Sequence, residues 1–318
     1  MSDDVDILVT LSAFGADSDR PLRLLEQSGF TFSLNPDNRR MKPDEVIKLG
    51  RTCQGVVASV EEYSVETLAQ LPNLRCISRC GVGIDNIDLR EAKRRGIAVL
   101  NTPDEPVAAV AEMTLGMMLS LLRELPQVNI LMHERKWQRI TGSLLAGKTI
   151  GLIGLGRIGR RVAELVQAFE ARVIGVEPYP DLEWIRNHAV ELVTLPALLG
   201  CADVVSIHAA ASLEEPFRLG AAEFAQMKPG ARLINMARGA FVDDVALSDA
   251  LASGHLSGAG LDVFPEEPYT GPLCQSDRVL LSPHQASLTL ETRIAMETRA
   301  VENLVGYLQG EGKDGQDN

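Results

Sequence analysis

Short apolar, β-branched segments alternate with amphipathic segments along most of this chain of 318 residues. In the first third, the strand candidates are residues 5–10, 55–60, 74–78 and 97–101, with helical stretches at residues 65–71 and 88–95. A second series of strand candidates covers residues 149–153, 172–176, 204–208, 231–235, 257–262 and 279–282. Strands that alternate with helices build parallel sheets covered by helices, so we predict an α/β fold.

The length of the chain favours two domains, because it exceeds the usual span of one hydrophobic core. From Val107 onward, apolar residues recur at helical spacing, and Pro103 and Pro106 mark the approach to this long helix. We expect the helix to carry the chain into a second domain with a complete doubly wound strand set of its own. Residues 291–308 predict a closing helix, and the polar tail at residues 310–318 is expected to be disordered.

The composition excludes several classes of protein. With 43 acidic and 31 basic residues, the formal net charge of -12 would repel a nucleic-acid backbone. The amino terminus lacks the features of a signal peptide, and no apolar run is long enough to span a bilayer. Five irregularly spaced cysteines indicate reduced thiols in a cytoplasmic protein, and the closest pair, Cys76 and Cys80, lacks the partners of a metal site.

A glycine motif at residues 154–159 follows an apolar strand and opens a predicted helix. In that context Gly154 can form a tight turn, Gly156 lets the backbone approach a pyrophosphate, and Gly159 lets helix and strand meet closely. The free N–H groups of the helix N-terminus would then face the phosphates. The alternative, a glycine turn without a ligand, is the weaker interpretation because the motif stands between a strand and a helix.

The next strand ends at Glu177, about twenty residues past the glycines, where an acid is expected to bind the ribose hydroxyls of a dinucleotide. A carboxylate there repels the extra phosphate of NADP, and the following Pro178 and Tyr179 offer no compensating arginine. We therefore predict NAD as the cofactor.

Three segments late in the chain place polar residues directly after strands, where α/β folds bind their ligands. Arg238 in the first segment could grip a substrate carboxylate with paired hydrogen bonds. His284 in the third could supply a proton at neutral pH, and a carboxylate beside the imidazole would favour its protonated form. The second segment offers Glu266 and Glu267, and the residues alone do not separate them.

The remaining histidines are weaker candidates for catalysis. His208 ends a strand, and we expect it to cap that strand or to line the cofactor site. His133, His188 and His255 lie in helical or turn contexts typical of surface residues.

At these residues the chain resembles the D-2-hydroxyacid dehydrogenase family, and further matching segments lie at residues 79–88, 101–103 and 110–112. The resemblance implies an NAD-dependent oxidoreductase of 2-hydroxy acids. It also implies that Arg238 holds the substrate carboxylate, that Glu267 pairs with the imidazole, and that His284 is the acid and base. The cofactor residues it supports are Gly154, Gly156, Arg157, Ile158, Gly159, Glu177, His208, Ala237 and Asp262, with Asp262 on the nicotinamide carboxamide. The substrate residues are Arg79, Val82, Gly83 and Arg238, with Val82 and Gly83 acting through their backbone.

The same resemblance implies how the domains are organised. Residues 1–102, completed by residues 287–318, would form a flavodoxin-like substrate-binding domain. Residues 103–286 would form a Rossmann-type NAD-binding domain inserted into it. The active site is then expected in the cleft, where closure excludes water. Members of the family are commonly homodimers built on the long helix after Pro106.

The substrate and one other functional class stay open. Within the family the chain resembles the phosphoglycerate dehydrogenase-like branch, and phosphoglycerate dehydrogenase is one function that this implies. Glu61 and Glu62 stand where that likeness suggests an arginine, which argues against a phosphorylated substrate. Arg79 or Arg139 could compensate for this. Hydroxypyruvate or glyoxylate reduction is the alternative within the family, and an NAD-sensing corepressor is the alternative outside catalysis.

Overall fold

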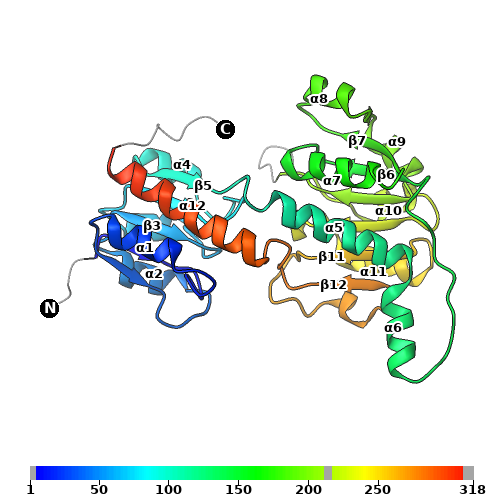
Figure 1. The fold of residues 1–318 in the computed structure, drawn as a ribbon, viewed down its shortest axis with the longest axis horizontal. Helices are drawn as coiled ribbons and strands as arrows, with labels where there is room; N and C mark the ends of the chain where they lie inside the picture. Colours follow the sequence, from blue (N-terminus) through cyan, green and yellow to red (C-terminus); the bar gives the residue numbers. More distant parts are fainter. Residues whose placement is uncertain (1–4, 211–216, 311–318) are drawn as a thin grey trace. The chain divides into compact units, whose positions relative to one another are not determined.

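The structure, a computed structural model, describes residues 5–210 and 217–310 (Figure 1). The chain forms two compact units. We call Met1–Pro106 together with Leu288–Asn318 the terminal unit, and Val107–Ser287 the central unit. The assignment of the terminal unit to substrate binding stays a prediction, and the tail predicted to be disordered lies almost wholly outside the described residues.

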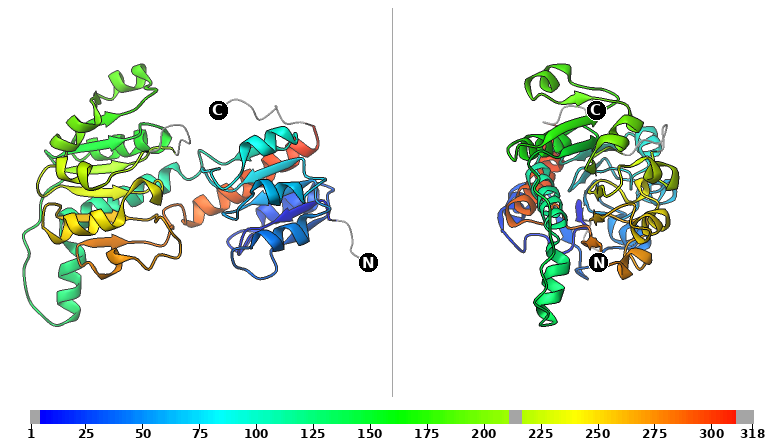
Figure 2. Two further views of the ribbon diagram at one scale, coloured as in Figure 1. Left: turned by 180° about the vertical axis from the view of Figure 1, so that it is seen from behind. Right: turned by 90° about the vertical axis from the view of Figure 1, so that its right-hand side faces the viewer.

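The terminal unit is built on a parallel five-stranded sheet with the order β2-β1-β3-β4-β5, the flavodoxin-like order. Its strands are β1 (Ile7–Val9), β2 (Phe32–Leu34), β3 (Gly55–Ala58), β4 (Cys76–Arg79) and β5 (Ala98–Asn101). One core joins the sheet to α2 (Pro43–Gly50), α3 (Val65–Ala69) and α4 (Leu89–Arg94). A second core joins its other face to α1 (Arg20–Gln27) and α12 (Leu290–Leu308). Figure 1 shows α12 in front of this sheet, and the reverse view in Figure 2 brings the opposite face forward.

The closing helix α12 belongs to the terminal unit because its apolar face fits the sheet there. Ala300, Val301 and Leu304 are fully buried. A Cβ atom at Gly55 of β3 would lie 2.9 Å from Leu304 Cδ1, so the absence of a side chain lets the helix sit close to the strand. Helix α12, late in the chain, thus covers one face of the sheet that the first hundred residues form.

The central unit is built on a parallel seven-stranded sheet with the order β12-β11-β10-β9-β6-β7-β8. Its strands are β6 (Thr149–Ile153), β7 (Arg172–Val176), β8 (Glu191–Leu192), β9 (Val204–Ile207), β10 (Arg232–Asn235), β11 (Gly258–Leu261) and β12 (Val279–Leu281). Read from β8, the first six strands follow the Rossmann order, and the direction of the order reverses between β6 and β9. The predicted fold class, two doubly wound parallel-sheet domains, is confirmed.

Helices cover both faces of the central sheet. One core contains α5 (Val107–Leu122) and α7 (Arg157–Gln167), which pack against each other. The other contains α9 (Leu195–Cys201), α10 (Ala221–Gln226) and α11 (Asp244–Ala252). The remaining helices are α6 (Leu125–His133), α8 (Leu182–Asn187) and two 3-10 turns, η1 (Gly239–Phe241) and η2 (Pro272–Gln275).

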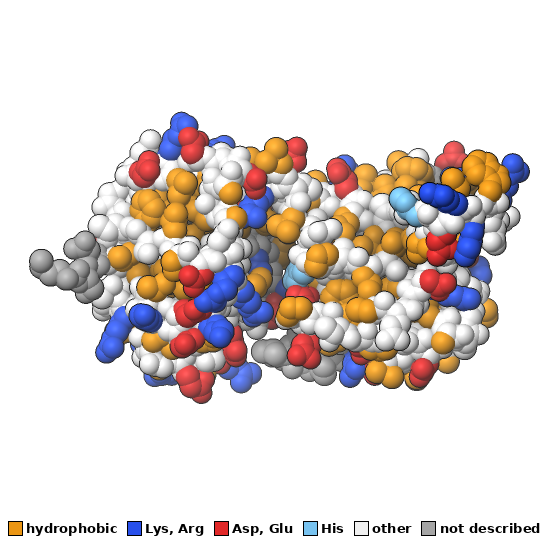
Figure 3. Space-filling model, turned by 90° about the horizontal axis from the view of Figure 1, so that it is seen from below, with side chains coloured by type: hydrophobic (Ala, Val, Ile, Leu, Met, Phe, Trp, Pro, Cys, Tyr) orange, Lys and Arg blue, Asp and Glu red, His pale blue; other side chains and the backbone are white. Residues whose placement is uncertain are grey.

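The surface is mixed in charge. On the face shown in Figure 3, acidic side chains lie among the basic ones on both parts of the chain. Among the residues that the structure describes, no helix combines the length and the apolar character needed to cross a membrane.

Candidate active site

The glycine motif lies in the turn between β6 and α7. Gly154 has a positive φ of 96°, and a Cβ atom there would lie 2.6 Å from the Ala209 nitrogen. A Cβ atom at Gly159 would lie 2.1 Å from the Gly154 carbonyl oxygen. At Gly156, the N-cap residue of α7, a Cβ atom would meet nothing within 4 Å. Two glycines therefore pack the turn against its neighbours, and the third leaves open space at the helix N-terminus, as a pyrophosphate requires.

Glu177 directly follows β7, and its carboxylate points back to the turn formed by the glycine motif, which we call the glycine turn. One carboxylate oxygen accepts a hydrogen bond from the Leu155 N–H at 2.8 Å, and the other accepts from the Tyr179 N–H at 3.1 Å. Both bonds fix the carboxylate beside the glycines. This is the place that ribose recognition would need, and the role itself stays a prediction.

His208 follows β9 beside the same turn. Its backbone N–H donates to the Ile153 carbonyl at 2.7 Å, and its Nε2 lies 2.8 Å from Ser206 Oγ. The buried Nδ1 has no hydrogen-bond partner among the described residues. Burial lowers the pKa of His208 to about 3, so the imidazole is neutral at physiological pH. A neutral ring whose Nδ1 atom has no protein partner among the described residues, beside the glycine turn, suits the predicted cofactor-lining role.

The three late segments meet at the carboxyl ends of the adjacent strands β10, β11 and β12. His284 Nδ1 lies 2.9 Å from Glu267 Oε2, which separates Glu267 from Glu266 as the partner of the imidazole. The other oxygen of Glu267 accepts from the Phe264 N–H at 3.1 Å. With 46% of its side chain exposed, His284 stays accessible to a small molecule.

Asp262 anchors the loop that carries His284. This aspartate is 1% exposed, and its carboxylate accepts from Ser282 Oγ at 2.5 Å, from the Gln285 N–H at 2.9 Å and from the Ala286 N–H at 2.8 Å. The His284 N–H donates to the backbone carbonyl of Asp262 at 2.8 Å, and His284 itself has a positive φ of 51°. The unusual backbone of His284 is thus fixed from both sides of the residue. The contact of Asp262 with nicotinamide stays a prediction.

Arg238 lies in the loop after β10. The side chain of Asn235 holds this loop with two hydrogen bonds to its backbone. Asn235 Nδ2 donates to the Arg238 carbonyl at 2.8 Å, and Asn235 Oδ1 accepts from the Ala237 N–H at 3.0 Å. A Cβ atom at the following Gly239 would lie 1.8 Å from the Phe264 carbonyl carbon. The backbone next to Arg238 therefore packs directly on the loop that carries Glu267.

The predicted substrate residues of the terminal unit surround the end of β4. Arg79 donates to the Cys80 carbonyl, and Gly81 has a positive φ of 138°. The Val82 carbonyl accepts from Asn101 Nδ2 at 2.7 Å. The bond from Asn101 ties the loop after β4 to the end of β5, and Val82 stays 40% exposed. The binding roles of Arg79, Val82 and Gly83 stay predictions.

The two glutamates after β3 differ in their surroundings. Glu61 is 1% exposed, and its Oε1 accepts from the Ser59 N–H at 3.0 Å and from Tyr63 Oη at 2.8 Å. Burial, together with the adjacent Glu61 charge, raises the pKa of Tyr63 well above its usual range, so this phenol stays a donor. Only Glu62 is exposed. Sequence reasoning missed Arg40, whose Nη2 donates to the Val60 carbonyl of the same loop at 2.7 Å.

Comparisons with known proteins agree with this geometry. Residues 115–286 match the family model described as "D-isomer specific 2-hydroxyacid dehydrogenase, NAD binding domain". The chain is 37% identical over 259 residues to D-3-phosphoglycerate dehydrogenase of Mycobacterium tuberculosis, a match that covers 80% of this chain and 49% of that protein. The chain thus spans about half the length of the curated relatives it matches.

Solved structures match over nearly the whole chain. The TT0316 protein of Thermus thermophilus is 33% identical with a TM-score of 0.85, and the match covers 96% of this chain and 97% of that one. A glyoxylate reductase from Paecilomyes thermophila is 28% identical with a TM-score of 0.86, and the match covers 97% and 96%.

The depressed pKa of His208 predicts a pH dependence of stability. A neutral histidine stabilises the fold above its unfolded pKa, and this contribution is lost as pH falls from about 6.5 toward 3. We expect the free energy of unfolding of the parent to fall relative to that of His208→Gln by up to about 1.4 kcal/mol per pH unit below 6. Urea unfolding without cofactor, followed by fluorescence of Trp137 and Trp184 in the central unit, measures this difference. Parallel pH curves for the two proteins would contradict the prediction.

Proposed function

Because this chain belongs to the D-isomer specific 2-hydroxyacid dehydrogenase family, with its NAD binding domain at residues 115–286, we propose that it interconverts a small 2-hydroxy acid and its 2-keto acid. The observation that carries the proposal is the 2.9 Å contact between His284 Nδ1 and Glu267. This pair, Arg238 and the glycine turn all belong to the central unit. An acid and base, a carboxylate-binding cation and a dinucleotide turn are the groups that such a reaction needs.

Each residue has a distinct part in the proposed reaction. The glycine motif would hold NADH, which when bound would supply the hydride for C2 of the keto acid. Arg238 holds the carboxylate of the substrate with paired hydrogen bonds. His284 donates the proton from Nε2 to the carbonyl oxygen, and in the opposite direction it accepts the hydroxyl proton. Glu267 stabilises the imidazolium and fixes the ring through Nδ1.

We favour an unphosphorylated substrate, although the curated relatives are named D-3-phosphoglycerate dehydrogenase. Glu62 is exposed on the loop after β3, where the family resemblance suggests a phosphate-binding arginine, so its negative charge would repel a phosphate there. The second candidate is a phosphorylated acid. Arg40 supports it, because its guanidinium is held on the Val60 carbonyl of the same loop and carries a positive charge that a phosphate could bind.

The proton-transfer role of His284 gives a direct prediction. His284→Ala should lower kcat for 2-keto acid reduction by about 10²-fold or more, because the variant has no acid at this position. Glu267→Gln keeps a hydrogen-bonding group without its charge and should give a smaller loss. His133→Ala, on the exposed end of α6, is the matched control and should turn over at the parent rate. Parent-like turnover of His284→Ala would falsify the mechanism, and NADH binding without turnover of any keto acid in the parent would favour a binding protein.

A panel of keto acids tests the substrate class. Assays of glyoxylate, hydroxypyruvate, pyruvate and phosphohydroxypyruvate by NADH absorbance should give the phosphorylated acid a kcat/KM lower by about tenfold or more, which corresponds to about 1.4 kcal/mol of repulsion. The opposite order would contradict this choice. If the phosphorylated acid is the better substrate, Arg40→Gln should lower kcat/KM for that acid alone.

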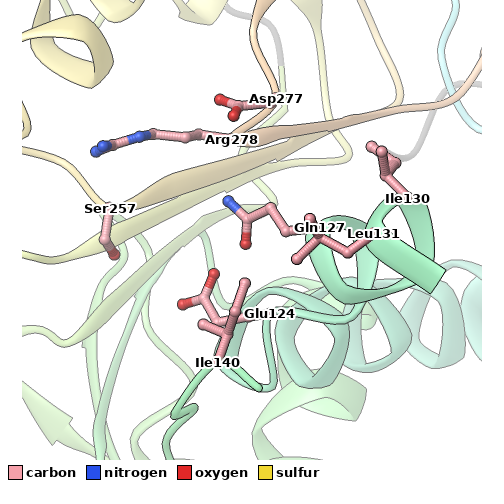
Figure 4. A pocket seen from close by; sticks show the side chains of 8 residues that line it. All are labelled: Glu124, Gln127, Ile130, Leu131, Ile140, Ser257, Asp277 and Arg278. Carbon is pink, nitrogen blue, oxygen red and sulfur yellow. The ribbon is translucent and has the colours of Figure 1, made fainter. Parts of the chain in front are cut away.

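We also propose that the protein is a homodimer that pairs through α5 and α6. None of the residues of α6 is buried within the chain. A hollow of about 480 Å³ lies beside α6, and Figure 4 shows the side chains that line it. Its lining combines apolar and charged side chains, namely Glu124, Gln127, Ile130, Leu131, Ile140, Ser257, Asp277 and Arg278. Met132 on α6 is 52% exposed, and Trp137 in the segment that follows this helix is 81% exposed. Exposed apolar side chains along one helix are typical of an interface.

The dimer predicts a change of mass when this surface becomes polar. Sedimentation at micromolar concentration should give twice the chain mass for the parent and the chain mass for the double variant Ile130→Glu, Trp137→Ser. Leu182→Ser, which replaces a residue that is 59% exposed on α8, is the control and should stay dimeric. A monomeric parent would sink the proposal.

The cytoplasm remains the proposed location. All five cysteines are free thiols, and Cys53 and Cys76 are buried. Free thiols suit a reducing compartment.

A further inference from the structure

We propose that Tyr269 is a positioning residue, which with Phe264 and Asp244 holds the Glu267 carboxylate against His284. We call these three residues the aromatic clamp. The proposal rests on the function proposed above and extends it to side chains outside the reacting groups.

The first contact of the aromatic clamp closes the loop that carries Glu267. The rings of Phe264 and Tyr269 are stacked, with centroids 4.4 Å apart and an angle of 18° between their planes. Glu267 lies in the chain between them, and its Oε1 accepts from the Phe264 N–H at 3.1 Å. The stack joins the two ends of the loop, while the hydrogen bond ties the carboxylate to one of those ends. The other oxygen of Glu267 is left for His284 Nδ1.

The second contact fixes the loop to the body of the central unit. Tyr269 Oη donates to Asp244 Oδ2 at 2.9 Å and accepts from the Leu273 N–H at 3.3 Å. Asp244 is the first residue of α11, whose Leu247 and Leu251 are buried in the core. Burial raises the pKa of Tyr269 to about 12, so the phenol keeps its proton throughout the working range of an enzyme. The clamp thus connects an exposed catalytic loop to a helix that is held by the core.

The third contact brings Arg238 into the same assembly. Gly239, directly after Arg238, packs so closely on Phe264 that a Cβ atom would lie 2.0 Å from the Phe264 carbonyl oxygen. A shift of Phe264 therefore moves the backbone next to the substrate-binding arginine as well as the amide that holds Glu267. No side-chain contact of Tyr269 with His284 is required, since the effect passes through Glu267.

The experiment compares Tyr269→Phe with the parent. This change keeps the stacked ring and removes only the hydroxyl, so the loop loses its tie to α11. With Glu267 held less firmly, its carboxylate orients the His284 ring less well and stabilises a positive charge on it less well. We expect kcat to fall by about 3- to 10-fold with KM changed less than about twofold. The pH–rate profile should move to lower pH.

Two further variants separate positioning from general stability. Asp244→Asn keeps an acceptor for the Tyr269 hydroxyl but removes its charge, so its pH–rate profile should shift in the same direction by less. Tyr307→Phe on α12 of the terminal unit is the matched control and should leave the profile unchanged. NADH affinity, measured by fluorescence quenching, should change less than kcat in all of these proteins, because no residue of the clamp belongs to the glycine motif.

A readout without turnover keeps this inference distinct from the proposed function. NMR titration of the His284 ring protons, assigned by their loss in His284→Ala, should show a lower midpoint in Tyr269→Phe than in the parent. A shifted midpoint in a protein that reduces no keto acid would support the clamp and reject the enzyme. Identical midpoints and identical pH–rate profiles in an active enzyme would overturn the clamp alone.

Discussion

The candidate active site depends on the buried carboxylate of Asp262. A charge that is 1% exposed would destabilise the fold unless hydrogen bonds compensated its lost hydration, and one hydroxyl and two backbone amides supply them. All three donors belong to the loop after β12. The need to satisfy one buried anion therefore dictates the path of the loop, and with it the position of His284.

The register of the parallel sheet determines where the other loops of the site lie. Residues on β10, β11 and β12 pair in register, so the loops that follow these strands leave the same edge side by side. The loops that carry Arg238, Glu267 and His284 come from segments distant in the sequence and leave the same edge of the sheet, where Glu267 pairs with His284. Close backbone packing at Gly239 and the closure by Asn235 then fix the loops against one another.

The parts of this structure that follow a local pattern could be predicted from the sequence. Every strand expected from its apolar run is present, most of them shorter by a residue or more, whereas the edge strands β2 and β8 were missed because they have only three and two residues and little buried surface. The pairing of Glu267 rather than Glu266 came from the family resemblance, since adjacent carboxylates differ only in backbone geometry. Arg40 and Tyr269 were not recognised, because their importance arises from contacts between segments about 20 to 25 residues apart.

The division of the chain has a consequence for how such proteins diversify. The Glu267–His284 pair, Arg238 and the glycine turn lie on the uninterrupted segment Val107–Ser287, while the rest of the chain folds as a separate unit from its two ends. Recombination at two junctions, after Pro106 and before Leu288, would exchange that outer module and leave the reacting groups intact. The helix α12 must travel with its own sheet in any such chimera, since its leucines fit a strand that begins at Gly55.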